Sequence, residues 1–281
     1  GLAVNAFLPA QQAYISDLAP FERRGRALAS VDIAFAISGV VMMPIIGWAI
    51  NTNGWQTPFY GLSALSIVAA ILTWVYLPEI KPHTQGGKAE NGMGQLLRKR
   101  NIQASLGVAI LLFIGVGIFM TFWGIWLSAD FGFDALDLGL MAQQIGIAEL
   151  LGAILAGLIV DRLGKRRTSL IGVAISAIMF ASIPLARENL LAIRILLVAT
   201  VFWIEFSIIA LFPLYGEQAP NARATIFALI ALGNGIGLAI GPILATTLWD
   251  RQGLGSITLI ASVSFALSAG LIWAFLNDTA E

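Results

Sequence analysis

Long apolar runs constrain the fold of this chain more than any other feature of its sequence. Most of them reach the length of about 20 residues that a helix needs to cross a bilayer. Barrel strands would be shorter and would alternate in polarity, which these runs do not. The sequence therefore predicts an all-α, polytopic membrane protein with nine transmembrane helices, over residues 1–15, 26–50, 58–77, 103–127, 137–161, 167–186, 190–215, 224–249 and 256–276.

The composition agrees with this fold class and disfavours several functions. The chain is 58% hydrophobic and 11% charged, which is less polar than a soluble domain. Its net charge is zero at pH 7, so no nucleic-acid partner is indicated. It has no cysteine, and its one histidine, His83, stands alone in a polar segment. We therefore expect no metal site, no cofactor and no enzymatic activity.

Basic residues lie mostly in alternate connections between the apolar runs. Of the 16 Lys and Arg, 13 occur near residues 23–26, 81–100, 162–167 and 223. By the positive-inside rule these connections face the cytoplasm. The C-terminus is then cytoplasmic too, and we expect a multi-pass protein of the cell membrane.

A weak internal repeat relates two parts of the chain. Ala19-Pro20, followed by Arg23 and a later Pro44, recurs in the same direction as Ala219-Pro220, Arg223 and Pro242. Parallel repeats of this kind are typical of transporters built from two similar halves. By this correspondence residue 1 matches about residue 199, so roughly 95 residues, three helices and the start of a fourth, are expected to precede Gly1.

The connection at residues 157–167 reads G-L-I-V-D-R-L-G-K-R-R. It resembles the G-x-x-x-D-R-x-G-R-R loop of the major facilitator superfamily of transporters, and the matching residues are Gly157, Asp161, Arg162, Gly164, Lys165 and Arg166. The resemblance implies a major facilitator fold lacking about three N-terminal helices. Residues 1–77 would be the remainder of the N-terminal half, 78–102 the cytoplasmic linker and 103–281 the C-terminal six-helix half.

A second resemblance concerns glycine and proline residues within two helices. Gly39, Pro44 and Gly47 look like the fifth-helix motif of proton-coupled drug antiporters, although Met43 stands where that family favours Gly. Gly241-Pro242, with Gly237 one turn earlier, fits the pattern better. The resemblance favours antiport, and we expect these small residues to serve close helix packing.

The resemblance also implies a cytoplasmic gate. In the family the loop around Asp161 lies against the start of the fifth helix, here about residues 25–29. The Asp161 carboxylate can accept hydrogen bonds from free N–H groups at a helix start, or it can form an ion pair with Arg23, Arg24 or Arg26. We expect this contact to hold the inside closed. The alternative is that the charged loop only ends the helices and fixes the topology.

Three acidic residues lie within predicted helices: Asp32, Glu149 and Glu205. A charge in hydrocarbon is costly, so each should face protein or water. The resemblance implies that the helix carrying Glu205 lines the substrate cavity. We expect Glu205 first and Glu149 second to bind a proton or a cation. The alternative for each, and above all for Asp32, is a neutral or paired structural carboxylate.

Other polar and aromatic residues are candidates for the lining of the cavity: Arg194, Asn234, Gln143, Gln144, Trp203 and Phe122. For each aromatic residue, ordinary packing is the alternative. The acidic residues favour cationic or neutral substrates, whereas Arg194 means that anionic substrates stay an alternative.

Together these observations predict a secondary active transporter that moves a small organic molecule by alternating access. Proton-coupled efflux, or antiport, is the leading interpretation, with the lipid bilayer, a small molecule and protons as partners and a monomer as the full-length form. A symporter or uniporter of a polar metabolite is one alternative. A non-transporting membrane receptor is an alternative of another class.

Overall fold

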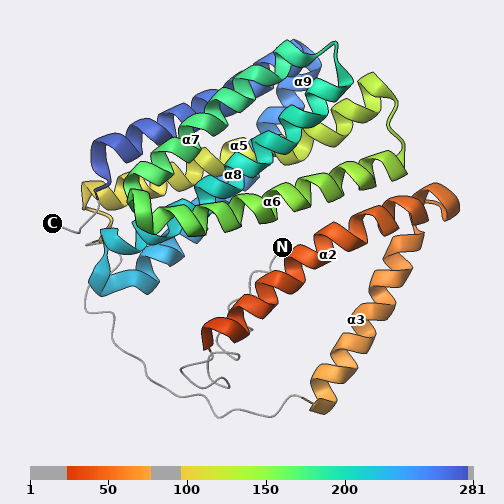
Figure 1. Ribbon diagram of the computed structural model, residues 1–281, viewed down its shortest axis with the longest axis horizontal. Helices are drawn as coiled ribbons and strands as arrows, with labels where there is room; N and C mark the ends of the chain where they lie inside the picture. Colours follow the sequence, from red (N-terminus) through yellow and green to blue (C-terminus); the bar gives the residue numbers. More distant parts are fainter. Residues whose placement is uncertain (1–23, 77–95, 278–281) are drawn as a thin grey trace. The chain divides into compact units, whose positions relative to one another are not determined.

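The computed structural model describes residues 24–76 and 96–277, and its regular structure there is entirely helical (Figure 1). Seven helical segments in these ranges are long and apolar enough to cross a membrane, which confirms the predicted fold class. The elements are α2 (Arg24–Asn53), α3 (Thr57–Tyr76), α5 (Arg100–Phe131), α6 (Ala135–Leu163), α7 (Lys165–Ser182), η2 (Ile183–Ala186), α8 (Leu190–Gln218), η3 (Pro220–Ala222) and α9 (Arg223–Phe275).

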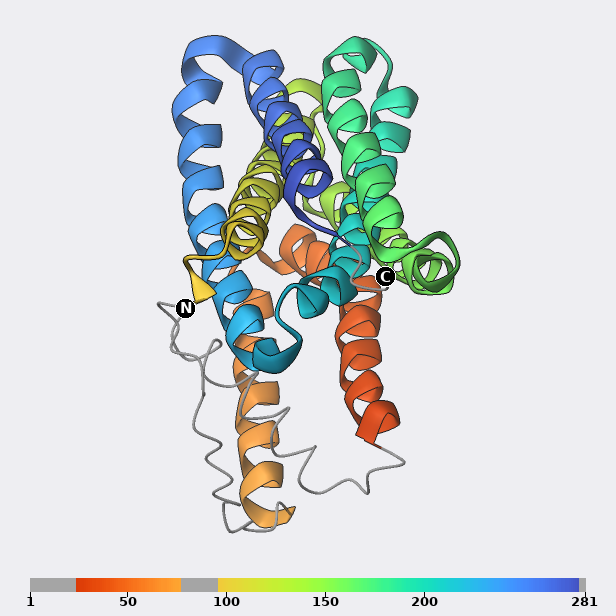
Figure 2. The ribbon, with the colours of Figure 1, turned by 90° about the vertical axis from the view of Figure 1, so that its left-hand side faces the viewer.

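Eight of the nine predicted helices correspond to described helices, because α9 contains two of them. The predicted helix 1–15 and most of the predicted linker 78–102 lie outside the described residues. Within α9, Gly253 has a φ of 71° and a ψ of −168°, a conformation that favours glycine and interrupts the helix. Figure 2 shows the chain reversing direction within α9, so its first limb (223–252) and second limb (254–275) belong to one bundle.

The chain forms two compact units. Of the described residues, the first comprises 24–76 and 134–143, and the second comprises 96–133 and 144–277. Within the first unit, α2 and the start of α6 meet through glycine. A Cβ added at Gly139 would lie 2.7 Å from the carbonyl oxygen of Met43 and 3.2 Å from the Cα of Gly47. The two backbones therefore touch, as small residues allow at helix crossings in membranes.

In the second unit, α5 packs against both limbs of α9. A Cβ added at Gly237 on the first limb would lie 2.5 Å from the carbonyl oxygen of Ile110 on α5. A Cβ at Gly241, one turn later, would lie 2.9 Å from the Cα of Gly117. On the second limb, Phe265 lies in the space that a side chain at residue 115 would need.

An aromatic cluster fills the core between α5, α7 and the second limb of α9. Phe119 stacks edge-on against Phe122 at 5.7 Å and against Phe180 at 6.2 Å between ring centroids. Phe180 in turn lies 5.4 Å from Phe265, and Trp126 continues the cluster along α5. All five side chains are at most 1% exposed. Such ring pairs contribute about 0.5–1.5 kcal/mol each beyond the area they bury.

The close contact between α5 and α9 leads to a matched test on one helix. Gly237→Ala places a methyl group 2.5 Å from a backbone oxygen, whereas Gly235 has nothing within 4 Å of its added Cβ. We expect Gly237→Ala to lower the free energy of unfolding by about 1–3 kcal/mol through overpacking. Gly235→Ala should be neutral or stabilising by up to about 1 kcal/mol, because Ala favours the helix. Thermal unfolding in detergent, followed by circular dichroism, measures both. Equal unfolding temperatures for the two variants would contradict the assigned contact.

Candidate functional site

The contact between α6 and α8 positions the two predicted carboxylates of the second unit. A Cβ added at Gly152 on α6 would clash with the carbonyl of Phe202 on α8 and lie 3.3 Å from the backbone nitrogen of Phe206. The two backbones therefore touch at this point. Glu149 lies three residues before Gly152, and Glu205 lies three residues after Phe202. The carboxylates thus flank one backbone contact between two membrane helices.

Glu149 and Glu205 are both partly buried carboxylates, each one helical turn from the contact between α6 and α8. Among the described residues neither carboxylate has an ion-pair or hydrogen-bond partner. Like charges repel more strongly in an apolar setting than in water. A proton or a cation bound at either group would relieve this repulsion. That Glu205 or Glu149 binds one of these stays a prediction.

A cavity of about 640 Å³ opens beside the same two helices. Gln144 and Arg194 are its polar members, and both are partly buried. The other lining residues are apolar: Ile147, Ala148, Leu151, Leu191, Ile195, Val198, Ala199 and Phe202. Few polar groups in an apolar cavity of this size are typical of small-molecule sites. The structure thus brings Gln144 and Arg194 together.

The remaining cavity candidates lie elsewhere. Trp203 packs against the neighbouring rings of its own helix, at 5.1 Å from Phe206. Phe122 belongs to the aromatic core and also borders a cavity of about 310 Å³ between α5 and α9. Asn234 borders a space of about 20 Å³ between α5, α8 and α9, and its buried side-chain oxygen has no hydrogen-bond partner in the described part of the chain. Gln143 belongs to the first unit, where its amide donates to the carbonyl of Val40 at 3.0 Å.

Several predicted residues cannot be assigned a contact. Arg23 lies outside the described residues. Arg24, Arg26 and Asp32 belong to α2, but their side chains lie outside the described part. The expected contact of Asp161 with residues 25–29 therefore stays a prediction.

The small residues of the antiporter-like motifs have different surroundings. Gly39 has nothing within 4 Å of an added Cβ, whereas Gly47 lies against Ala135 at the start of α6. Pro44 lies inside α2, and Pro242 lies inside the first limb of α9. Pro242 lies close to Gly117 of α5. A Cβ added at Gly117 would lie 3.0 Å from the Cδ of Pro242.

The charged connection between α6 and α7 turns at a glycine. Gly164 has a φ of 86°, a conformation that L side chains rarely adopt. Gly157, Asp161 and Arg162 are exposed on α6. On α7, Lys165 forms an ion pair with Glu217 at the end of α8, and Arg166 donates to the carbonyl of Trp273 on α9. The cations of this motif thus join the ends of three helices.

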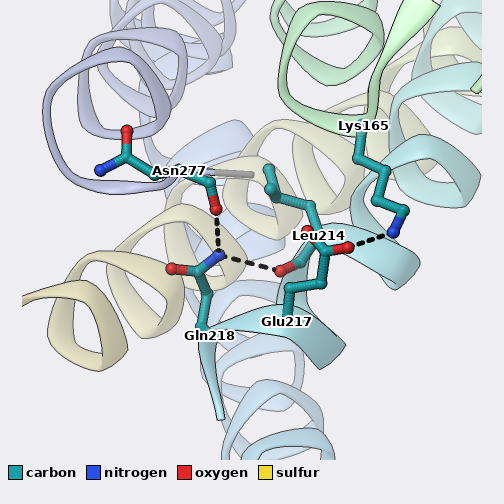
Figure 3. A network of polar contacts seen from close by, with 5 residues as sticks. All are labelled: Lys165, Leu214, Glu217, Gln218 and Asn277. Carbon is teal, nitrogen blue, oxygen red and sulfur yellow. Dashed lines mark hydrogen bonds and ion pairs between the residues drawn. The ribbon is translucent and has the colours of Figure 1, made fainter. Parts of the chain in front are cut away.

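Figure 3 shows the network around Glu217 and Gln218. The amide of Gln218 donates to the carbonyl oxygens of Leu214 and Asn277, at 3.1 Å each. Asn101, at the start of α5, donates to the backbone carbonyl of Gln218 at 3.1 Å. Sequence reasoning missed these residues because the helix was predicted to end at 215. In the structure α8 continues to Gln218, which places Glu217 and Gln218 on the helix.

The Lys165–Glu217 pair joins two charges that are each unfavourable on their own helix. Lys165 opens α7, where the helix dipole is positive, and Glu217 lies near the end of α8, where the dipole is negative. The ion pair brings each charge to the favourable end of the neighbouring helix. The two side chains are 32% and 15% exposed, so the pair is only partly screened by solvent.

Removing one partner should therefore destabilise this end of the bundle. We expect Lys165→Met to lower the free energy of unfolding by about 1–3 kcal/mol, because it leaves the carboxylate of Glu217 partly buried and unpaired. Glu217→Gln added to Lys165→Met should recover part of the loss. The control is Arg167→Met, which removes an exposed cation two residues later. A double-mutant cycle from thermal unfolding measures the coupling, and additive effects would refute the pair.

Comparisons with known proteins agree with this architecture. The model of the Major Facilitator Superfamily matches residues 1–122 and 105–281. An uncharacterized transporter of the superfamily type from Bacillus subtilis, YceJ, is 26% identical over 255 residues, which cover 88% of this chain and 63% of that protein. Multidrug resistance protein 2 of the same organism is 25% identical over 266 residues, with 89% and 64% covered.

Among solved structures, the crystal structure of a bacterial homolog of the human lysosomal transporter Spinster has a TM-score of 0.69 at 16% identity. The likeness covers 97% of this chain and 76% of that one, and shows a shared fold. This chain spans less than two thirds of the length of either B. subtilis relative. Because the family model matches the chain from end to end, the protein belongs to the major facilitator superfamily.

Proposed function

We propose that this chain acts in a secondary active transporter that exports a small organic molecule in exchange for protons. Members of the family are transporters rather than enzymes. The observation that carries the proposal is the pair of partly buried carboxylates, Glu149 and Glu205, beside the cavity between α6 and α8. A protonatable pair next to a small-molecule cavity is what the coupling of proton and substrate binding requires.

The direction of transport rests on resemblance. One relative is a multidrug resistance protein by name, and 25% identity over 89% of this chain supports a related activity. We also propose that the C-terminus faces the cytoplasm and that the protein works as a monomer in the cell membrane. The distribution of Lys and Arg between alternate connections supports this orientation.

Alternating access requires a contact that closes the cytoplasmic side and can break. We propose that Asp161 makes this contact with the start of α2 near Arg24. Asp161 is exposed at the end of α6 in the second unit, so its carboxylate is available to a partner. Lys165 and Arg166, by contrast, already interact with α8 and α9. In this proposal the cations hold the bundle together and Asp161 forms the gate.

The proton site can be tested with one substitution and a matched control. We expect that adding a transported compound to the purified protein releases protons, and that Glu205→Gln abolishes this release. The reason is that an amide cannot take up or lose the proton. Glu188→Gln, an exposed acid before α8, should leave proton release unchanged. A pH-indicator dye in weakly buffered detergent solution measures the effect.

Each result of this experiment has a defined meaning. Unchanged release in Glu205→Gln would refute Glu205 as the proton site and make Glu149→Gln the next variant. Compound binding without proton release in the unmodified protein would overturn proton antiport altogether. Equal losses in Glu205→Gln and Glu188→Gln would point to general damage rather than to a proton site.

The gate predicts a separate change in accessibility. The chain has no native cysteine, so a single introduced cysteine can be labelled selectively. With Val198→Cys in the cavity wall, we expect Asp161→Asn to increase the rate of labelling from the cytoplasmic side several-fold, because the inside then opens more often. Asp137→Asn, at the other end of α6, is the matched control. Equal labelling rates in all three proteins would refute the gate.

A further inference from the structure

Arg194 is a partly buried cation with no partner among the residues that the structure describes. It lies in the second turn of α8 and lines the cavity shared with α6. It has no ion pair and no hydrogen bond to another described residue. A guanidinium is always charged and presents five N–H donors, so leaving it unpaired in apolar surroundings is costly. A ligand that supplies an anion would remove this cost.

Gln144 lies at the same level of the cavity as Arg194. Each residue comes eight positions before the backbone contact, Gln144 before Gly152 on α6 and Arg194 before Phe202 on α8. Eight residues of helix span about 12 Å, so both polar groups lie at one end of the cavity. Toward the other end of the cavity the two helices touch at Gly152 and Phe202. The cavity therefore has a polar end with N–H donors and an apolar end with an aromatic ring.

We infer that this cavity binds an amphipathic organic carboxylate, with its charged group between Arg194 and Gln144 and its apolar body toward Phe202. The guanidinium can donate two parallel hydrogen bonds to a carboxylate, and the Gln144 amide can donate a third. The body would lie against Leu151 and Val198, which line the cavity between these ends. The inference names the substrate class of the proposed transporter and rests on that proposal for its biological meaning.

Charge and size argue against other occupants. A cationic body at the polar end would be repelled by Arg194, and a neutral one would leave its charge unpaired. The volume of about 640 Å³ is within the range of roughly 300–1,000 Å³ that suits a single small organic molecule. Glu149 comes five residues after Gln144, about 7.5 Å along α6, and Glu205 lies past the backbone contact. An anion at Arg194 is therefore kept apart from Glu205 by about 16 Å along α8.

The test compares two ligands that share one aromatic body and differ in a single group, an anionic carboxylate or a neutral amide. We would measure the binding of 1-naphthaleneacetate and of the neutral 1-naphthaleneacetamide by calorimetry, with the protein in nanodiscs of phosphatidylcholine. We expect the carboxylate to bind at least tenfold more tightly than the amide. Arg194→Gln should remove this difference and leave the amide affinity unchanged. Arg187→Gln, an exposed cation before α8, is the matched control and should keep the difference.

Other variants and lipids separate the remaining explanations. Val198→Trp, which fills the apolar part of the cavity, should weaken both ligands. Equal affinities for the carboxylate and the amide in the unmodified protein would overturn the inference, and this measurement does not depend on any variant folding. Loss of carboxylate binding when phosphatidylglycerol is added to the nanodiscs would also overturn it, because the site would then hold an anionic lipid headgroup.

Failure of the proposed function remains distinguishable from failure of this site. Calorimetry detects the anion site without a proton gradient or transport. Tenfold discrimination without any proton release would uphold the anion site and contradict proton antiport. Proton release with equal affinities for the two ligands would contradict the anion site and leave antiport standing.

Discussion

The second unit depends on the close backbone contact between α5 and the first limb of α9. Gly237 and Gly241 leave no room for a side chain against α5, and Gly117 meets them from the other side. Within a bilayer, helices gain little from burying apolar surface against each other, since lipid is equally apolar. Close approach of backbones instead provides van der Waals contact along the crossing. This contact aligns α5, against which the second limb of α9 also packs.

The same principle shapes the candidate site. Gly152 allows α6 to touch α8, and this contact places Glu149 and Glu205 one turn to either side of it. Away from the contact the helices leave the cavity that contains Arg194. A small residue therefore does more than tighten the packing. It sets the distance between groups whose charges would each be costly in lipid alone.

The end of the bundle near Gln218 is held together by hydrogen bonds and an ion pair instead of by close backbone contact. Lys165 and Glu217 compensate each other across two helix ends, and Gln218 joins α8 to Asn101 and Asn277. Each contact satisfies a group at a helix terminus, where backbone carbonyls and N–H groups lack partners within the helix. The charged motif of the connection thus has a structural role as well as the gating role proposed for Asp161.

Adjacent residues show why the site could be predicted only in part. Gln143 and Gln144 are equivalent in sequence, yet one donates to Val40 and the other lines the cavity beside Arg194. Successive residues of a helix point about 100° apart, so the rotation of α6 decides which glutamine faces the cavity. Phe122 likewise matched a cavity residue by type, but its ring packs against Phe119 and Trp126 in the buried aromatic core.

The sequence by itself determined the helices, the family and the types of residue available for chemistry. Length and hydropathy suffice for this, because the bilayer requires long apolar helices whatever their neighbours are. Only the tertiary structure decided that Arg194 shares a cavity with Gln144, that Glu149 and Glu205 flank one helix contact, and that Lys165 pairs with Glu217. These relations join residues far apart in the chain, and they follow from helix rotation and crossing, which depend on packing between helices.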